Sequence, residues 1–83
     1  MKAPDITPPL VLIVWEDACN LDTDAWADNN PVKYEPKLFQ QVGFLLHDGK
    51  EGVILTSAWS ADKVAPRDQI PRGMIRKITK LKP

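Results

Sequence analysis

The chain has few of the residues that most often carry covalent chemistry. Its 83 residues include one cysteine and one histidine. A single cysteine, Cys19, excludes an internal disulfide framework and is typical of proteins in a reducing compartment. The sequence also lacks metal-ligand spacing, a glycine-rich phosphate loop and a nucleophile–histidine signature. These absences predict a protein that is not an enzyme and that holds no cofactor.

Long hydrophobic runs are absent as well. The longest one, residues 10–15, is far shorter than the roughly 20 residues that a membrane-spanning helix requires. It is also too short for a secretory signal. We therefore expect a cytoplasmic protein with no membrane contact. Prolines at positions 4, 8 and 9 predict a flexible leader over residues 1–9, followed by a single small domain over residues 10–83.

The net charge is zero, but charge is unevenly distributed along the chain. Residues 1–31 contain one lysine against six acidic residues, whereas residues 63–83 contain seven basic residues against one aspartate. Such asymmetry indicates either separate acidic and basic partner sites or two ends that neighbour and neutralise each other in the fold. We favour the second interpretation, because the termini of small domains usually lie close together.

The clearest structural pattern is a β-hairpin over residues 38–58, where two apolar runs flank a polar turn. Asp48-Gly49 lies between the runs and is a strong hairpin signal, and Gly52 leaves loops of two and of four residues both open. Val42 and Phe44 are expected on the same face as Val53 and Leu55. Apolar residues on the opposite parity predict that both faces are covered, as in a barrel or sandwich.

Shorter elements complete the predicted fold. Residues 10–15 and 75–81 are expected to form the first and last strands, and residues 67–70 a minor one. A one-turn helix is expected over residues 70–74, because Pro71 presets the first φ and Gly73 releases the chain. This order predicts an all-β, five-stranded SH3-like or Sm-like barrel, with an OB-type barrel as the alternative.

The long connection between the first strand and the hairpin is expected to contain a short helix. Asp22 or Thr23 caps it, and the chain turns through residues 24–28 before Pro31 ends it. In this arrangement, Trp26 covers one end of the barrel. The acidic loop that starts at Asn20 lacks the glycine and glutamate of a calcium loop, so no metal is expected. His47 beside Asp48 is interpreted as an exposed hairpin residue.

Aromatic and basic residues supply the candidate binding positions. Three tryptophans are more than a small barrel needs, and exposed aromatics with nearby arginine are typical of interfaces. The candidate contact residues are Trp59, Arg67, Arg72, Trp26 and Tyr34. Trp59 has an alternative role as a lid on the barrel mouth. The alternative function is single-stranded nucleic-acid or nucleotide binding, with Trp59, Tyr34 or Phe39 stacking on bases. The basic residues for that function are Arg76, Lys77, Lys80 and Lys82, although a pI of about 6.5 disfavours it.

Several motifs together resemble a group of small proteins of tailed bacteriophages and prophages. They cover nearly the whole chain and comprise Val14-Trp15-x-Asp17-Ala18, Trp26, Val42-Gly43-Phe44-Leu45-Leu46, Val53-Ile54-Leu55 and Ile70-Pro71-x-Gly73-x-Ile75. The resemblance implies a phage origin and residence in the host cytoplasm, and it brings no catalytic residues. The leading hypothesis is a non-catalytic accessory protein that binds a host protein, in a takeover or anti-defence role. A minor virion component is a further alternative, and a homo-oligomer is compatible with each hypothesis.

Overall fold

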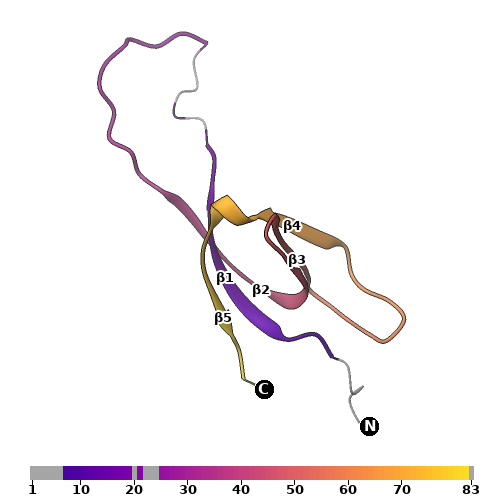
Figure 1. Ribbon diagram of the computed structural model, residues 1–83. Coiled ribbons are helices and arrows are strands. Elements are labelled where there is room, and N and C mark those ends of the chain that lie inside the picture. The colour runs from indigo at the N-terminus through magenta and orange to yellow at the C-terminus, as the bar shows by residue number, and fades with distance from the viewer. Residues whose placement is uncertain (1–6, 20, 22–24, 83) are drawn as a thin grey trace.

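The computed structural model describes residues 7–19, 21 and 25–82 (Figure 1). It contains five strands and one short 3-10 helix: β1 (Leu10–Asp17), β2 (Lys37–Asp48), β3 (Gly52–Thr56), β4 (Arg67–Pro71), η1 (Arg72–Met74) and β5 (Ile75–Lys80). The predicted all-β class is therefore confirmed, as is the single helical turn before the last strand. Most of the predicted leader, residues 1–6, lies outside the described residues.

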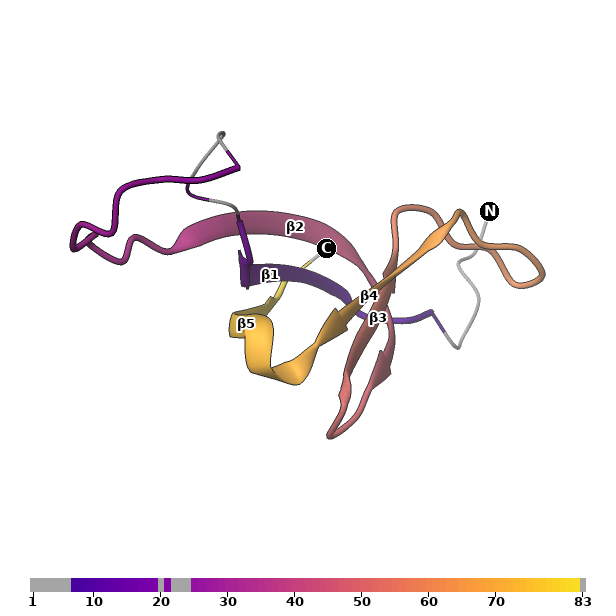
Figure 2. The same ribbon diagram turned by 90° about the horizontal axis from the view of Figure 1, so that it is seen from above.

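The strands form one antiparallel sheet in the order β4-β3-β2-β1-β5. Figure 2 shows β2 bending along its length, so that one half lies beside β1 and the other half beside β3. In the described part of the chain β4 and β5 remain the two edges, and the sheet is open. The predicted closure into a barrel is thus not confirmed.

The core is small and comes from alternate positions on three strands. Val11 and Ile13 on β1, Val53 and Leu55 on β3, and Ile70 on β4 are buried, and all but Ile70 have no exposed surface. Successive side chains of a strand point to opposite faces, so a spacing of two residues puts each pair on one face. Five buried apolar side chains, at about 1.5–3 kcal/mol each, supply the principal hydrophobic stabilisation.

The register of the hairpin differs from the expected one. Leu45, rather than Val42 or Phe44, shares the core face with Leu55, because Leu45 and Leu55 are direct partners. Val42 and Phe44 point to the other face, where Val42 is 54% exposed. The prediction that these two residues lie beside Val53 and Leu55 is therefore wrong. An irregularity between Leu45 and His47 shifts the pairing by one residue, and such a shift exchanges the faces.

The turn of this hairpin is centred two residues later than Asp48-Gly49. Gly49 and Gly52 exchange backbone hydrogen bonds of 2.9 and 3.3 Å, which leaves Lys50 and Glu51 as a two-residue loop. Of the two loop lengths left open by the sequence, the structure has the shorter one. Gly52 is the one described residue with a positive φ, at +156°.

The connection between β1 and β2 contains no helix in its described part. Residues 25–36 form bends and irregular backbone, and the proposed capping residues Asp22 and Thr23 lie outside the described residues. Trp26 does not cover one end of the sheet, because 92% of its surface is exposed. No described residue of this segment is buried, so no tertiary contact offsets the marginal stability of such a short helix.

We predict that Gly52→Ala destabilises the fold and that Gly73→Ala does not. A Cβ on Gly52 would lie 2.3 Å from the Ile70 carbonyl oxygen, and its φ is one that residues with a side chain rarely adopt. A Cβ on Gly73 meets nothing within 4 Å. Chemical denaturation should show a loss of about 2–4 kcal/mol for Gly52→Ala and less than about 0.5 kcal/mol for Gly73→Ala. Equal effects of the two variants would contradict this packing.

Candidate functional site

The described part of the connection between β1 and β2 projects from the sheet as an arm, which we define as residues 18, 19, 21 and 25–36 (Figure 1). The molecule measures 61 Å along its longest axis, and its radius of gyration is 17.3 Å. A compact chain of this length would have a radius of gyration of about 12 Å. β1 and β2 remain paired out to Asp17 and Lys37, so the arm begins beyond the last ladder position of the sheet.

The arm and the adjoining start of β2 carry most of the exposed large hydrophobic side chains of the described residues. Among the described residues, six of the eight lie between positions 21 and 39: Leu21, Trp26, Val32, Tyr34, Leu38 and Phe39. Trp26 and Tyr34 are 92% and 73% exposed. Scattered exposed apolar residues need no explanation, but their concentration on one projecting segment is typical of an interaction surface.

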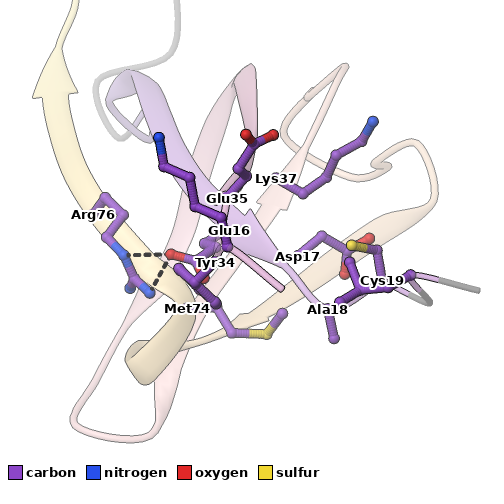
Figure 3. A pocket seen from close by; sticks show the side chains of 11 residues that line it. Glu16, Asp17, Ala18, Cys19, Tyr34, Glu35, Lys37, Met74 and Arg76 are labelled. Carbon is purple, nitrogen blue, oxygen red and sulfur yellow. Dashed lines mark hydrogen bonds and ion pairs between the residues drawn. The ribbon is translucent and has the colours of Figure 1, made fainter. Parts of the chain in front are cut away.

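A hollow of about 380 Å³ lies where the arm joins the sheet (Figure 3). Side chains from β1, the arm, the start of β2, η1 and the start of β5 line it, with Tyr34, Cys19 and Met74 among them. On one side Arg76 donates two hydrogen bonds to Glu16 Oε1, at 2.8 and 3.2 Å. This ion pair ties β5 to the end of β1, close to the base of the arm.

A second hollow, of about 430 Å³, shares Asp17 and Met74 with the first and adjoins the core. The indole of Trp15 stacks on Phe39 with ring centroids 5.0 Å apart and donates a 3.2 Å hydrogen bond to Gln41 Oε1. Gln41 Nε2 in turn donates a 2.9 Å bond to Asp68. Aromatic, amide and carboxylate groups therefore meet at this second hollow, which we call the mouth of the sheet. Together they can contact a peptide that has both apolar and basic side chains.

Sequence reasoning did not assign Gln41 or Asp68 to this mouth. The two residues are far apart along the chain, and they meet on the core side of the sheet, where Gln41 pairs with the buried Ile13 and Asp68 with the buried Leu55. One available signal was Asp68, the single acidic residue among the basic ones of the C-terminal segment. Two residues before the buried Ile70, it takes a position on the core face of β4.

The predicted contact residues fall into two groups that the structure does not bring together. Trp26 and Tyr34 lie on the arm. Trp59 lies in the connection between β3 and β4, and Arg67 is the first residue of β4; this connection is on the opposite side of the molecule (Figures 1 and 2). Trp59 is partly buried and bridges to Val64 within that connection. Its two proposed roles, as an interface residue and as a lid, stay predictions.

Arg72 is engaged within the chain. Its Nε donates to the Gly49 carbonyl at 3.2 Å, and its guanidinium pairs with Asp48. The backbone N–H of Arg72 also donates to the Glu51 carbonyl at 3.0 Å. These contacts connect η1 to the turn of the β2–β3 hairpin, so Arg72 has a structural role whether or not it contacts a partner.

The basic residues proposed for nucleic-acid binding follow the edge strand β5. Arg76 is paired with Glu16, while Lys77, Lys80 and Lys82 are exposed and take part in no ion pair among the described residues. Phe39 is the ladder partner of Trp15 and Tyr34 belongs to the arm, whereas Lys80 is the partner of Val11, four residues further along β1. The structure thus separates Lys80 from two of the three aromatic residues proposed to stack on bases, while Lys77, the partner of Val14, lies closer to them.

The described residues contain neither a metal-binding cluster nor a membrane-spanning helix. Within residues 7–19, 21 and 25–82, no three histidine, cysteine or acidic side chains gather in a way that could hold a metal ion. Most of the acidic loop considered for calcium, including Asn20 and Asp22, lies outside these residues. Over the same described residues, no helix has the length and apolar character needed to cross a membrane.

His47 contacts Glu51 across the hairpin turn, and both side chains are exposed. The pKa of Glu51 is lowered, chiefly by a hydrogen bond from its own backbone N–H and then by the bond to His47. Hydrogen bonds to the charged form favour ionisation. This contact links β2 to the two-residue loop of the turn.

We predict a small loss of stability in acid that depends on Glu51. Because the folded-state pKa is lowered, the contribution is present above pH 4.5 and disappears as the pH falls through the folded-state pKa. Carboxyl titration by NMR should place the Glu51 midpoint below 4.5 in the native chain and closer to 4.5 in His47→Asn. Glu51→Gln should remove this part of the pH dependence of unfolding, whereas Glu35→Gln on the arm should leave it unchanged.

No family model, curated protein or solved structure matches this chain. A proposal on its function therefore rests on its own surface, and above all on the exposed arm and on the mouth of the sheet at the base of that arm.

Proposed function

We propose that this chain is a non-catalytic, phage-encoded accessory protein that acts in the host cytoplasm by binding a host protein. The observation that carries the proposal is the projecting arm with its exposed Trp26 and Tyr34. Aromatic side chains contribute a large contact area at a small conformational cost, and they dominate the energetics of many protein interfaces. The phage origin rests on the sequence resemblance alone.

The charge of the arm also indicates the chemistry of the partner. The sequence between β1 and β2 contains four acidic residues, Asp22, Asp24, Asp28 and Glu35, against one lysine, Lys33. An acidic, aromatic surface suits a partner whose interface is basic and apolar, because complementary charges steer association and reject unlike partners. A nucleic-acid backbone would be repelled by this end of the molecule.

We further propose that the fold is an SH3-like barrel with an open mouth. The strand order β4-β3-β2-β1-β5 and the single helical turn between β4 and β5 support this assignment. The bend of β2 supports it too, since one strand then serves both halves of the sheet (Figure 2). In such an arrangement, the mouth beside Trp15 and Gln41 is the surface next to the arm that a bound segment would enter.

Nucleic-acid binding is the second candidate, supported by Lys77, Lys80 and Lys82, which take part in no ion pair within the described residues. Titration of labelled single-stranded DNA and RNA at low salt tests it directly. This function requires affinity that falls steeply as salt rises, and that is lost in Lys77→Glu combined with Lys80→Glu. A minor virion role is tested by searching purified particles for the chain by mass spectrometry.

We predict that removing the arm aromatics abolishes capture of the host partner. Tagged protein produced in the host should recover one partner in stoichiometric amount, as measured by quantitative mass spectrometry. Trp26→Ala combined with Tyr34→Ala should weaken binding to that purified partner by about 30-fold or more, the typical effect of losing an interface hot spot. These residues are exposed, so the fold should remain intact.

Trp59→Ala is the matched control, because it removes a tryptophan from the connection on the opposite side of the molecule. It should change affinity less than threefold. Loss of binding with Trp59→Ala alone would move the interface to the Trp59–Arg67 group. Recovery of no partner above background would count against the proposal as a whole.

A further inference from the structure

The first half of β2 has an edge that no strand of the described chain covers. β3 pairs with β2 only from Phe44 onward, beginning at the Phe44–Thr56 pair. On its other edge, β2 is paired with β1 all the way down to Lys37. Figure 2 shows this half of β2 along one rim of the sheet, with β1 on its inner side. We call residues 38–42, on the side away from β1, the free edge of β2.

The direction of the backbone groups at the free edge follows from the ladder with β1. The N–H of Leu45 donates to the Pro9 carbonyl at 2.8 Å, so the backbone of Leu45 faces β1. In an antiparallel pair, residues that bond to the partner strand alternate with residues whose N–H and C=O point away from it. The N–H and C=O groups of Leu38, Gln40 and Val42 therefore point to the free edge. No backbone hydrogen bond within the described residues satisfies them there.

The free edge of β2 lacks the features that protect the other two edges of the described sheet. β5 carries Arg76 and Lys80, and β4 carries Arg67 and Pro71. Charged side chains and proline on an edge strand hinder the addition of another strand. Residues 38–42 contain neither a charged residue nor a proline. This stretch is thus the place where the described sheet is open to a further strand.

The side chains on one face of the free edge are apolar at both ends. Leu38 and Val42 are each 54% exposed. They lie on the same face, away from the core, because side chains on a strand alternate between its two faces. A strand added at this edge would bring every second side chain next to them. Apolar side chains at those positions would remove both residues from water.

The other face of the free edge leads to an acidic hollow. Gln41 lies on this face and lines the mouth together with Asp17 and Asp68, and no cationic side chain lines it. Lys37 is the ladder partner of Asp17, but neither aspartate forms an ion pair within the described residues. Arg67 precedes Asp68 and so points to the other face of β4. Basic side chains on this face of an added strand would complement the two carboxylates.

We propose that an extended segment of the host protein adds to the sheet as a sixth strand along the free edge of β2. Its backbone bonds to Leu38, Gln40 and Val42, its apolar side chains alternate with basic ones, and the basic ones face the mouth. An extended backbone matches groups left unpaired at every second residue, whereas a helix satisfies its own. The free edge begins two residues after the arm, so one partner can contact both. This inference rests on the proposed function and names the part of the host protein that is recognised.

The probe is a seven-residue peptide, blocked at both ends, in which valine alternates with arginine. It should bind the chain in 150 mM NaCl with a dissociation constant below about 100 µM, and a version with glutamate in place of arginine should bind at least tenfold more weakly. N-methylation of one alternate set of its residues should abolish binding, because that set donates to β2. N-methylation of the other set should change affinity less than threefold. Absence of binding, or equal effects of the two sets, overturns the proposal.

Proline substitutions test the edge from the side of the protein. Gln40→Pro removes a donor of the free edge and should abolish peptide binding, while the fold remains because this N–H does not bond to β1. Lys80→Pro is the matched control. It places proline on the edge of β5 away from β1, since the next residue, Leu81, donates to the Leu10 carbonyl. Lys80→Pro should change affinity less than threefold, and equal effects of the two variants overturn the assignment.

Amide hydrogen exchange of the unsubstituted chain gives a readout that does not depend on any variant. In the free chain, Leu38, Gln40 and Val42 should exchange faster than Phe39 and Gln41, which bond to β1. Saturating peptide should slow exchange of the first three amides at least tenfold. Slowing that is confined to the arm overturns the strand addition.

Two further outcomes separate this inference from its alternatives. A dimer of the chain alone at 50 µM that Gln40→Pro dissociates, measured by sedimentation equilibrium, would show that a second copy occupies the edge and overturns the host segment as its occupant. A host partner that depends on Trp26 and Tyr34 but binds Gln40→Pro as tightly as the unsubstituted chain would overturn the strand addition and leave the proposed function standing.

Discussion

The pairing of β1 with two neighbours is the constraint on which the rest of the structure depends. β1 binds β2 on one edge and β5 on the other, and its Val11 and Ile13 have no exposed surface. The two ladders have unequal lengths. β5 pairs with β1 only as far as Trp15, whereas β2 stays paired to Asp17. The β1–β2 ribbon therefore extends past the sheet, and the arm is the continuation of that overhang.

This overhang also determines where charge is located. Because the arm leaves from the far end of β1, the acidic segment of the chain is held away from both described ends of the sequence (Figure 1). The basic residues of β5 run the other way, since β5 is antiparallel to β1. Sequence reasoning favoured neighbouring, mutually neutral ends, and only Glu16 with Arg76 behaves in that way among the described residues.

Local sequence patterns predicted well which elements form. They predicted poorly how the strands pair. Pro71 and Gly73 indicated a single helical turn, and the apolar runs indicated the hairpin, because these signals depend on nearby residues alone. The faces of β2 depend instead on the irregularity between Leu45 and His47, which no residue type announces. The lack of information on tertiary contacts also explains why Trp26 was wrongly expected to cover one end of the barrel. A large apolar side chain predicts burial only if some element reaches it, and none of the described elements does.

The candidate site was predictable to a similar extent. Trp26 and Tyr34 were predicted as contact residues from their type, and this stays a prediction. The contact between Gln41 and Asp68 depends on the pairing of strands that are far apart in the sequence. A core of five buried apolar side chains, counted over the described residues, is small for a chain of 83. Leu12, Val14 and Val42 lie on the face of the β1–β2 ladder opposite that core, and exposed apolar residues add little stability while water covers them. The stability of the described sheet therefore depends on the few side chains of β1, β3 and β4 that are fully covered.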